Sequence, residues 1–315
     1  MRVVLGSVLV AAVAYGGYWF VGSHMFRKGA EDWFAAQQAE GLVAEREALS
    51  VTGFPSRFDL TVTAPHIADP QTGWGWRAPF AQIFALSYNP THVIFALPDD
   101  QVVETPLGDV AVAATGLKGS VRVGLDLAPV RTAATGESIR ATLPDGEALA
   151  DSFRWGSRVT EGAIHEVALE IAGLGLTAPG VDLRGGSFTA NGTVTLAPVV
   201  ADLPVDERPV EMPLDALSLT QAVLRFGDVS VQVSGDVTAD ADGFAAGQML
   251  LRVEDWPAAL DAAVKAGLIP ENRAETLEGG FRMMANGDAV EMPLTLADGV
   301  VRFGPLPLAN APRLK

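Results

Sequence analysis

The residues of this chain that could carry out catalysis or bind a metal are few and widely separated. The chain has four histidines, His24, His66, His92 and His165, and no cysteine. No histidine is paired at three or four residues with another ligand on a predicted helix, so no zinc site is recognisable. Without cysteine, thiol catalysis and disulfides are also excluded. We therefore predict that the protein binds no metal and no cofactor.

Acid–base and nucleophilic groups do not form a recognisable catalytic set either. Asp99 and Asp100 follow a proline, and adjacent residues on a turn seldom converge on one substrate, which favours a solvated turn. His165 begins a predicted strand, whereas His92 follows a turn and is expected to be a hydrogen-bonded structural histidine. A G-x-S-x-G elbow, a phosphate-binding loop and a dinucleotide fingerprint are all missing. We expect no catalytic residues, so the protein is not predicted to be an enzyme.

Apolar residues are better candidates for a binding site. Residues 83–88 and 92–97 are apolar on both faces and flank Asn89-Pro90, which predicts a buried hairpin. Trp74 and Trp76 are separated by one residue, so on an extended segment their side chains point the same way. Together with Phe80, they could form an exposed aromatic patch that binds a lipid or a partner. The alternative is that they fill the core at the edge of a sheet. The candidate apolar lining comprises Trp74, Trp76, Phe80, Ile83, Phe84, Leu86, Val93, Ile94 and Phe95.

The elements that must position these residues are mostly strands. Apolar and polar residues alternate in many short segments, and the chain contains 33 glycines and 20 prolines, which suits strands and turns. We predict a mainly β fold with a few helices, whose antiparallel sheets form a curved groove, half-barrel or sandwich. A β-rich lobe is expected over 49–200, a proline-bearing linker over 201–213 and a second β lobe over 214–315. A helical pair is expected at about 255–284, within that second lobe.

An uncharged stretch near the N-terminus predicts a transmembrane anchor over residues 1–22. Residues 3–21 carry no charge and would span about 28 Å as a helix, close to a hydrocarbon core of about 30 Å. Tyr18, Trp19 and Phe20 are expected at the membrane interface. Two alternatives are a signal peptide cleaved after Ala14 and a buried core helix. An amphipathic helix over 23–48 is expected to follow and to pack on the domain.

The charge of the chain limits its partners and, with the anchor, predicts its location. A net charge of -16 repels phosphate backbones, so we predict no binding to nucleic acid. The anchor predicts membrane lipid as a partner, with other envelope proteins as further candidates. We expect a single-pass protein of the inner (cytoplasmic) membrane with the bulk of the chain in the periplasm.

Several segments resemble a known family. They are Gly53–Asp59 at the first strand, Trp76–His92, and Pro293–Gly299 with Phe303–Leu308 near the end. From the anchor to the C-terminus, the chain is similar to the uncharacterised bacterial family called domain of unknown function 2125. The resemblance implies an exported or membrane-anchored protein, and it implies no activity.

These observations predict a membrane-anchored envelope protein. Strands that are apolar on both faces beside an anchor favour an apolar groove that binds or passes lipid or another envelope amphiphile. One alternative is a non-catalytic structural or scaffold protein of a membrane complex. The other is an enzyme of unrecognised type.

Overall fold

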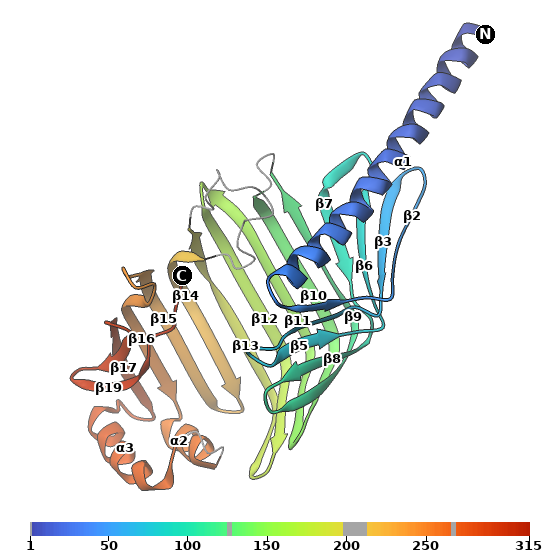
Figure 1. Cartoon of the computed structure of the whole chain (residues 1–315). Helices are drawn as coiled ribbons and strands as arrows, with labels where there is room; N and C mark the ends of the chain where they lie inside the picture. Colours follow the sequence, from blue (N-terminus) through green and yellow to red (C-terminus); the bar gives the residue numbers. More distant parts are fainter. Residues whose placement is uncertain (1, 125–127, 198–212, 266–268) are drawn as a thin grey trace. The chain divides into compact units, whose positions relative to one another are not determined.

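The structure is a computed structural model that describes residues 2–124, 128–197, 213–265 and 269–315, without the side chains of residues 2–6, 8 and 9. The chain divides into two compact units, Met1–Pro144 and Asp145–Lys315. Both units are built mainly of antiparallel β-strands, which make up 62% of the chain, and the sheet is not closed (Figure 1). The predicted fold class, mainly β with a few helices, is therefore confirmed.

Unit 1 begins with one long helix, α1 (Arg2–Ala39), whereas we expected the helix that continues from the anchor to run to about residue 48. The predicted end was wrong. Gly41 adopts a left-handed conformation with φ of 91°, which glycine tolerates, and the chain turns into strands instead. Within the described residues, no helix combines the length and apolar character that crossing a membrane requires.

Ten strands follow α1 in the described part of unit 1. They are β1 (Val43–Glu45), β2 (Ala48–Thr52), β3 (Arg57–Thr63), β4 (His66–Asp69), β5 (Trp74–Arg77), β6 (Phe80–Leu86), β7 (Asn89–Ala96), β8 (Asp100–Thr105), β9 (Gly108–Val123) and β10 (Pro129–Leu143). The predicted hairpin is present, because β6 and β7 pair directly.

Strand β9 organises unit 1, since it pairs with two different strands along one edge. Its first part pairs with β8 and its later part with β7, while β10 pairs along the other edge. Gly116 lies between the two parts with φ of 62°, where a residue with a side chain would be strained. The strands therefore branch into two rows, β2–β3–β6–β7 and β1–β4–β5–β8.

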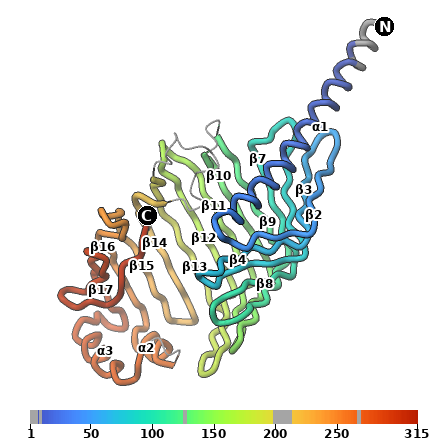
Figure 2. Tube along the Cα trace, viewed as in Figure 1, coloured from blue at the N-terminus to red at the C-terminus, as the bar shows by residue number. Residues whose placement is uncertain are grey.

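Helix α1 packs on strands of both rows and closes the core of unit 1. Phe34 is buried with Ala44 of β1 and with Leu60 and Val62 of β3. Burial of a large apolar side chain contributes about 1.5–3 kcal/mol, so this cluster holds the helix against the strands. The second half of α1 is thus a core element, as its amphipathic pattern predicted, while the first part extends beyond the strands (Figure 2).

Unit 2 is an antiparallel meander in which each strand pairs with the next along the chain. Its strands are β11 (Gly146–Glu161), β12 (Ile164–Ala178), β13 (Val181–Leu196), β14 (Leu214–Phe226), β15 (Val229–Ala239), β16 (Ala245–Glu254), β17 (Ala289–Ala297), β18 (Val300–Phe303) and β19 (Leu306–Asn310). Strands β13 and β14 pair across the predicted linker, so the division of the chain at residue 144 differs from the boundary expected at 201–213. Residues 201–212 of that linker lie outside the described residues.

The sheet of unit 2 separates an apolar face from a charged one, because residues paired across strands share a face. One apolar row runs through Phe153, Ile171, Phe188, Leu224, Val231, Val253 and Val290. The alternate positions along these strands point to the opposite face, which carries exposed ion pairs such as Arg158 with Glu166 at 2.6 Å.

Two helices cover one end of the apolar face in unit 2, at about the positions expected. They are α2 (Trp256–Lys265) and α3 (Glu271–Met284). Trp256 and Leu260 are buried together with Val290 and Met292 of β17. Asp255 accepts a hydrogen bond of 3.4 Å from the Ala258 backbone N–H, which supports the predicted start of α2.

Candidate functional site

An apolar pocket lies between α1 and the strands of unit 1. Its volume is about 520 Å³, within the range of about 300–1,000 Å³ that small-molecule sites occupy. None of the lining residues is charged. They are Met25, Phe26, Gly29, Ala30, Trp33, Phe34, Leu60, Val62, Pro65, Ile67, Trp76, Ala81, Ile83 and Val93.

Helix α1 forms one wall of this pocket because its apolar residues recur every three or four positions. Phe26, Ala30 and Phe34 lie on the face turned to the strands and also join the core. Gly29 adds open space, since a Cβ placed there would meet no atom within 4 Å. Met25 and Trp33 are 67% and 42% exposed, so the pocket reaches the protein surface at these residues.

The opposite wall contains three of the nine residues predicted from the sequence. Trp76 of β5, Ile83 of β6 and Val93 of β7 all line the pocket. Strand alternation puts them on one side of their strands, together with Leu60, which pairs directly with Ile83. The structure therefore brings together residues from three strands that the sequence could only nominate separately.

The other six predicted residues lie outside the lining. Phe95 pairs with Ile83 and shares its face, but its ring lies across Gly119. Trp74 is 54% exposed near the start of β5. The remaining four fall on the opposite face of their strands by alternation. They are Phe80, Phe84, Leu86 and Ile94.

Sequence reasoning missed the contribution of α1 to the pocket. The amphipathic pattern of residues 23–48 had indicated packing on the domain, and this signal located the helix face correctly. It gave no sign that the packing would be incomplete. A gap between two packed surfaces depends on the side chains of both, and the partner strands are 26 or more residues from Phe34 along the chain.

Trp76 is fixed in the pocket wall by a single side-chain hydrogen bond. Its indole N–H donates to Oε1 of Gln101 at 2.8 Å, and the amide of Gln101 in turn donates to the Pro98 carbonyl at 3.1 Å. Gln101 is buried, so these bonds satisfy polar groups that would otherwise be costly. Because its one polar atom is satisfied in this way, Trp76 can line the pocket with its apolar ring.

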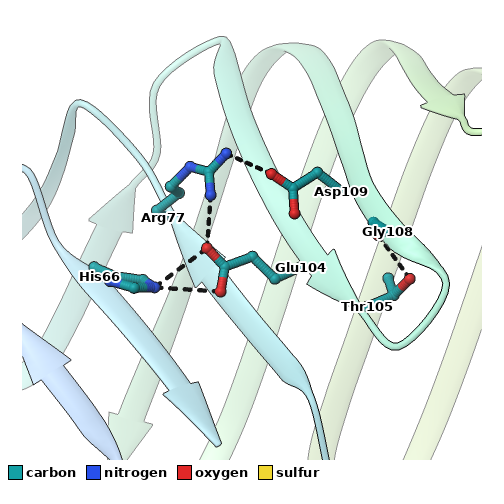
Figure 3. A network of polar contacts seen from close by, with 6 residues as sticks. All are labelled: His66, Arg77, Glu104, Thr105, Gly108 and Asp109. Carbon is teal, nitrogen blue, oxygen red and sulfur yellow. Dashed lines mark hydrogen bonds and ion pairs between the residues drawn. The ribbon is translucent and has the colours of Figure 1, made fainter. Parts of the chain in front are cut away.

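A polar network lies beside Trp76 (Figure 3). Arg77 donates to Glu104 and to Asp109 at 2.6 Å each, and the His66 ring nitrogen lies 3.2 Å from Glu104. Hydrogen bonds from Arg77 to Asp109 and then to Glu104 raise the pKa of the Arg77 guanidinium above its ordinary value. Gly75 permits this approach, because a Cβ there would lie 2.5 Å from a Glu104 oxygen.

The network ties strands of unit 1 together. Arg77 is held by two carboxylates, so its charge is already matched, and the four residues belong to β4, β5, β8 and β9. A pocket of about 500 Å³ borders it and includes His66 and Arg77. Among the residues that the structure describes, no group of three or more His, Asp or Glu side chains is arranged to hold a metal ion.

Fold and site together define a class of protein: an open antiparallel β-protein with a long N-terminal helix docked over an apolar pocket. The chain belongs to the family described as uncharacterized protein conserved in bacteria (DUF2125), whose family model matches residues 19–312. This confirms the resemblance noted from the sequence. No curated protein and no solved structure matches the chain.

Proposed function

We propose that this protein is a membrane-anchored envelope protein that binds the apolar chain of a lipid, or of another envelope amphiphile, in the pocket beneath α1. The lining of the pocket carries this proposal. Water in such a site would lack the two to four polar partners it needs, whereas each buried CH₂ group of a ligand would gain about 0.8 kcal/mol. A charged headgroup would stay outside, at the exposed edge formed by Met25 and Trp33.

The membrane location is part of the same proposal and is supported by the sequence. Residues 3–21 are uncharged, and they precede the pocket-lining part of the same helix by only a few residues. A pocket close to a bilayer can receive an acyl chain without exposing it to water over a long distance. We propose the inner membrane of the cell envelope as the location, with both units on the periplasmic side.

Native mass spectrometry of the full chain purified in detergent tests the proposal. We expect the wild-type protein to retain lipid and the Gly29→Leu variant to lose it by about tenfold or more. The new side chain enters open space beside the helix, so it should fill the pocket without displacing α1.

Gly17→Leu is the matched control, because Gly17 lies on the same helix, has equally open surroundings and does not line the pocket. It should retain lipid at the wild-type level. Lipid that merely coats the helix would be equally abundant in both variants, and that result would overturn the pocket as the binding site. A wild-type chain without lipid that crosslinks to an envelope protein would favour a scaffold instead.

A further inference from the structure

A group of exposed aromatic side chains lies on α1 and on the loops beside it, where the helix leaves the strands of unit 1. We call it the aromatic collar. Its exposed fractions are 39% for Tyr15, 47% for Tyr18, 65% for Phe20, 57% for Phe54 and 71% for Tyr88. The first three residues belong to α1, while Phe54 precedes β3 and Tyr88 lies in the β6–β7 turn. Residues distant in sequence thus form one group, whose rings are apolar and whose tyrosine hydroxyls are polar.

The collar is fixed to the domain by specific contacts. The Tyr15 hydroxyl lies 2.8 Å from the Ser87 hydroxyl, and the Tyr18 hydroxyl donates to the Ser87 carbonyl at 2.7 Å. The Trp19 indole N–H donates to the Arg57 carbonyl at 2.6 Å. Trp19 is 6% exposed and packs on Phe54 with ring centroids 5.3 Å apart. The helix therefore leaves unit 1 at a defined point and in a defined direction.

This docking removes length from the uncharged stretch. Arg2 precedes it, and Tyr15 is the first of these hydrogen-bonded residues, so only residues 3–14 remain between them. At about 1.5 Å per residue they measure about 18 Å, well short of a hydrocarbon core of about 30 Å. If α1 spans a bilayer, the collar must lie within it, and part of the domain must be seated in the lipid.

We propose that the aromatic collar is a membrane-seating surface that lies at the boundary between headgroups and acyl chains, in the leaflet nearer to unit 1. This proposal rests on the proposed membrane anchor. Tyrosine and phenylalanine suit that depth, since their rings are apolar and the tyrosine hydroxyls reach polar groups. The collar itself contains no charged residue.

Seating the collar would also bring the pocket to the membrane surface. Met25 follows Phe20 by five helix residues, about 7.5 Å along the axis. Met25 is exposed and lines the pocket, so the pocket edge would lie just outside the hydrocarbon core, at the depth of the lipid headgroups. The collar thus specifies where an apolar ligand would enter: through the headgroup region beside unit 1, a short distance from the acyl chains.

Site-directed spin labelling tests the collar, because the chain contains no cysteine to remove. Single variants Phe54→Cys and Tyr88→Cys carry a nitroxide in the full chain, reconstituted in phosphatidylcholine vesicles. Leu107→Cys is the control, an apolar residue that is 88% exposed in the β8–β9 turn. His92, four residues after Tyr88, pairs with Arg122 near the end of β9, whereas Leu107 precedes the start of that strand. The control and the Tyr88 label therefore lie at opposite ends of a strand roughly 45 Å long.

We expect labels at positions 54 and 88 to collide several-fold more often with oxygen, and less often with a water-soluble nickel complex, than the label at 107. Water-like accessibility at both 54 and 88 in a chain that floats with the vesicles would overturn the collar and leave the anchor standing. A chain that does not float would overturn the anchor and the collar with it. Phe54 packs on Trp19 and Phe20, whereas Tyr88 is 71% exposed, so the Tyr88 variant keeps the test valid if Phe54→Cys unfolds.

Discussion

His165 is a histidine buried in the apolar face of unit 2. It is 5% exposed on β12, and its cross-strand partners are Val159 and Val194. Burial lowers its pKa below the ordinary value of 6.5 because the charged imidazolium loses its hydration. A catalytic role gains no support from these apolar neighbours.

The lowered pKa predicts a loss of stability in mild acid. The unfolded chain takes up a proton near the ordinary pKa, whereas the folded chain resists protonation, so the free energy of unfolding falls as pH drops below about 6.5. Thermal unfolding followed from about pH 7.5 to about pH 5.5 should show this decrease. His165→Leu removes the titrating group, and the decrease in that variant should be smaller. Equal slopes for both proteins would contradict the prediction.

Trp19 illustrates how one residue type serves two environments. An indole with one polar atom suits a membrane interface, and the sequence pattern predicted that location. In the structure the indole N–H of Trp19 donates to the Arg57 carbonyl, and its ring packs on Phe58. Of the three residues expected at the interface, Trp19 is buried, whereas Tyr18 and Phe20 are exposed and belong to the collar.

At the scale of elements, the docking of α1 depends on Gly22. A Cβ at this position would lie 2.5 Å from the ring of Phe58, which is itself buried against Trp19 and Phe26. Glycine is otherwise costly in a helix, by about 1 kcal/mol relative to alanine. Its presence here allows the helix to approach β3 closely.

Gly22→Ala should therefore destabilise unit 1 despite its better helix propensity. Overpacking costs about 1–3 kcal/mol, which exceeds the propensity gain of about 1 kcal/mol. Gly17→Ala, on the same helix with open surroundings, should instead be neutral or stabilising. The effect of each substitution can be measured by hydrogen exchange of the β3 amides in detergent. Unchanged exchange in the Gly22 variant would show that close packing at Gly22 is unimportant, and equally fast exchange in both variants would show that the effect is not specific to Gly22.

Strand pairing is the second determinant at this scale. Ile83 and Phe84 are adjacent and both apolar, yet only Ile83 lines the pocket. Because β3 pairs with β6 in a register that joins Leu60 to Ile83, the face carrying Ile83 is the one turned to α1. A shift of one residue would exchange the two side chains.

For the whole molecule, the proposed anchor predicts a topology. Alkaline phosphatase fused after Lys315 should be active in bacteria, because this enzyme folds only after export, while a green fluorescent protein fused there by the same route should stay dark. The net charge of -16 is compatible with either side, so the prediction depends on the uncharged N-terminal stretch. Deleting residues 3–14 should abolish phosphatase activity. A bright fluorescent fusion and an inactive phosphatase would place the units in the cytoplasm and refute the proposed location.

The sequence by itself determined the element types and the family. Alternation predicted strands, the pattern around residues 255–284 predicted two helices, and the motifs at Gly53–Asp59 and Trp76–His92 indicated DUF2125 membership. These signals are local, since each is read from neighbouring residues along the chain. The lack of a recognisable catalytic motif is likewise a property of the sequence alone.

Only the tertiary structure decided which apolar residues form a site. Strands that are apolar on both faces carry no alternation to orient them, so Trp76, Ile83 and Val93 could not be separated from Phe84 or Ile94 by pattern. The pocket and the collar both require α1 to meet strands far along the chain, and such contacts depend on register and packing. Long-range packing leaves little trace in the local pattern, which is why the helix wall and the shortened free helix emerged only from the fold.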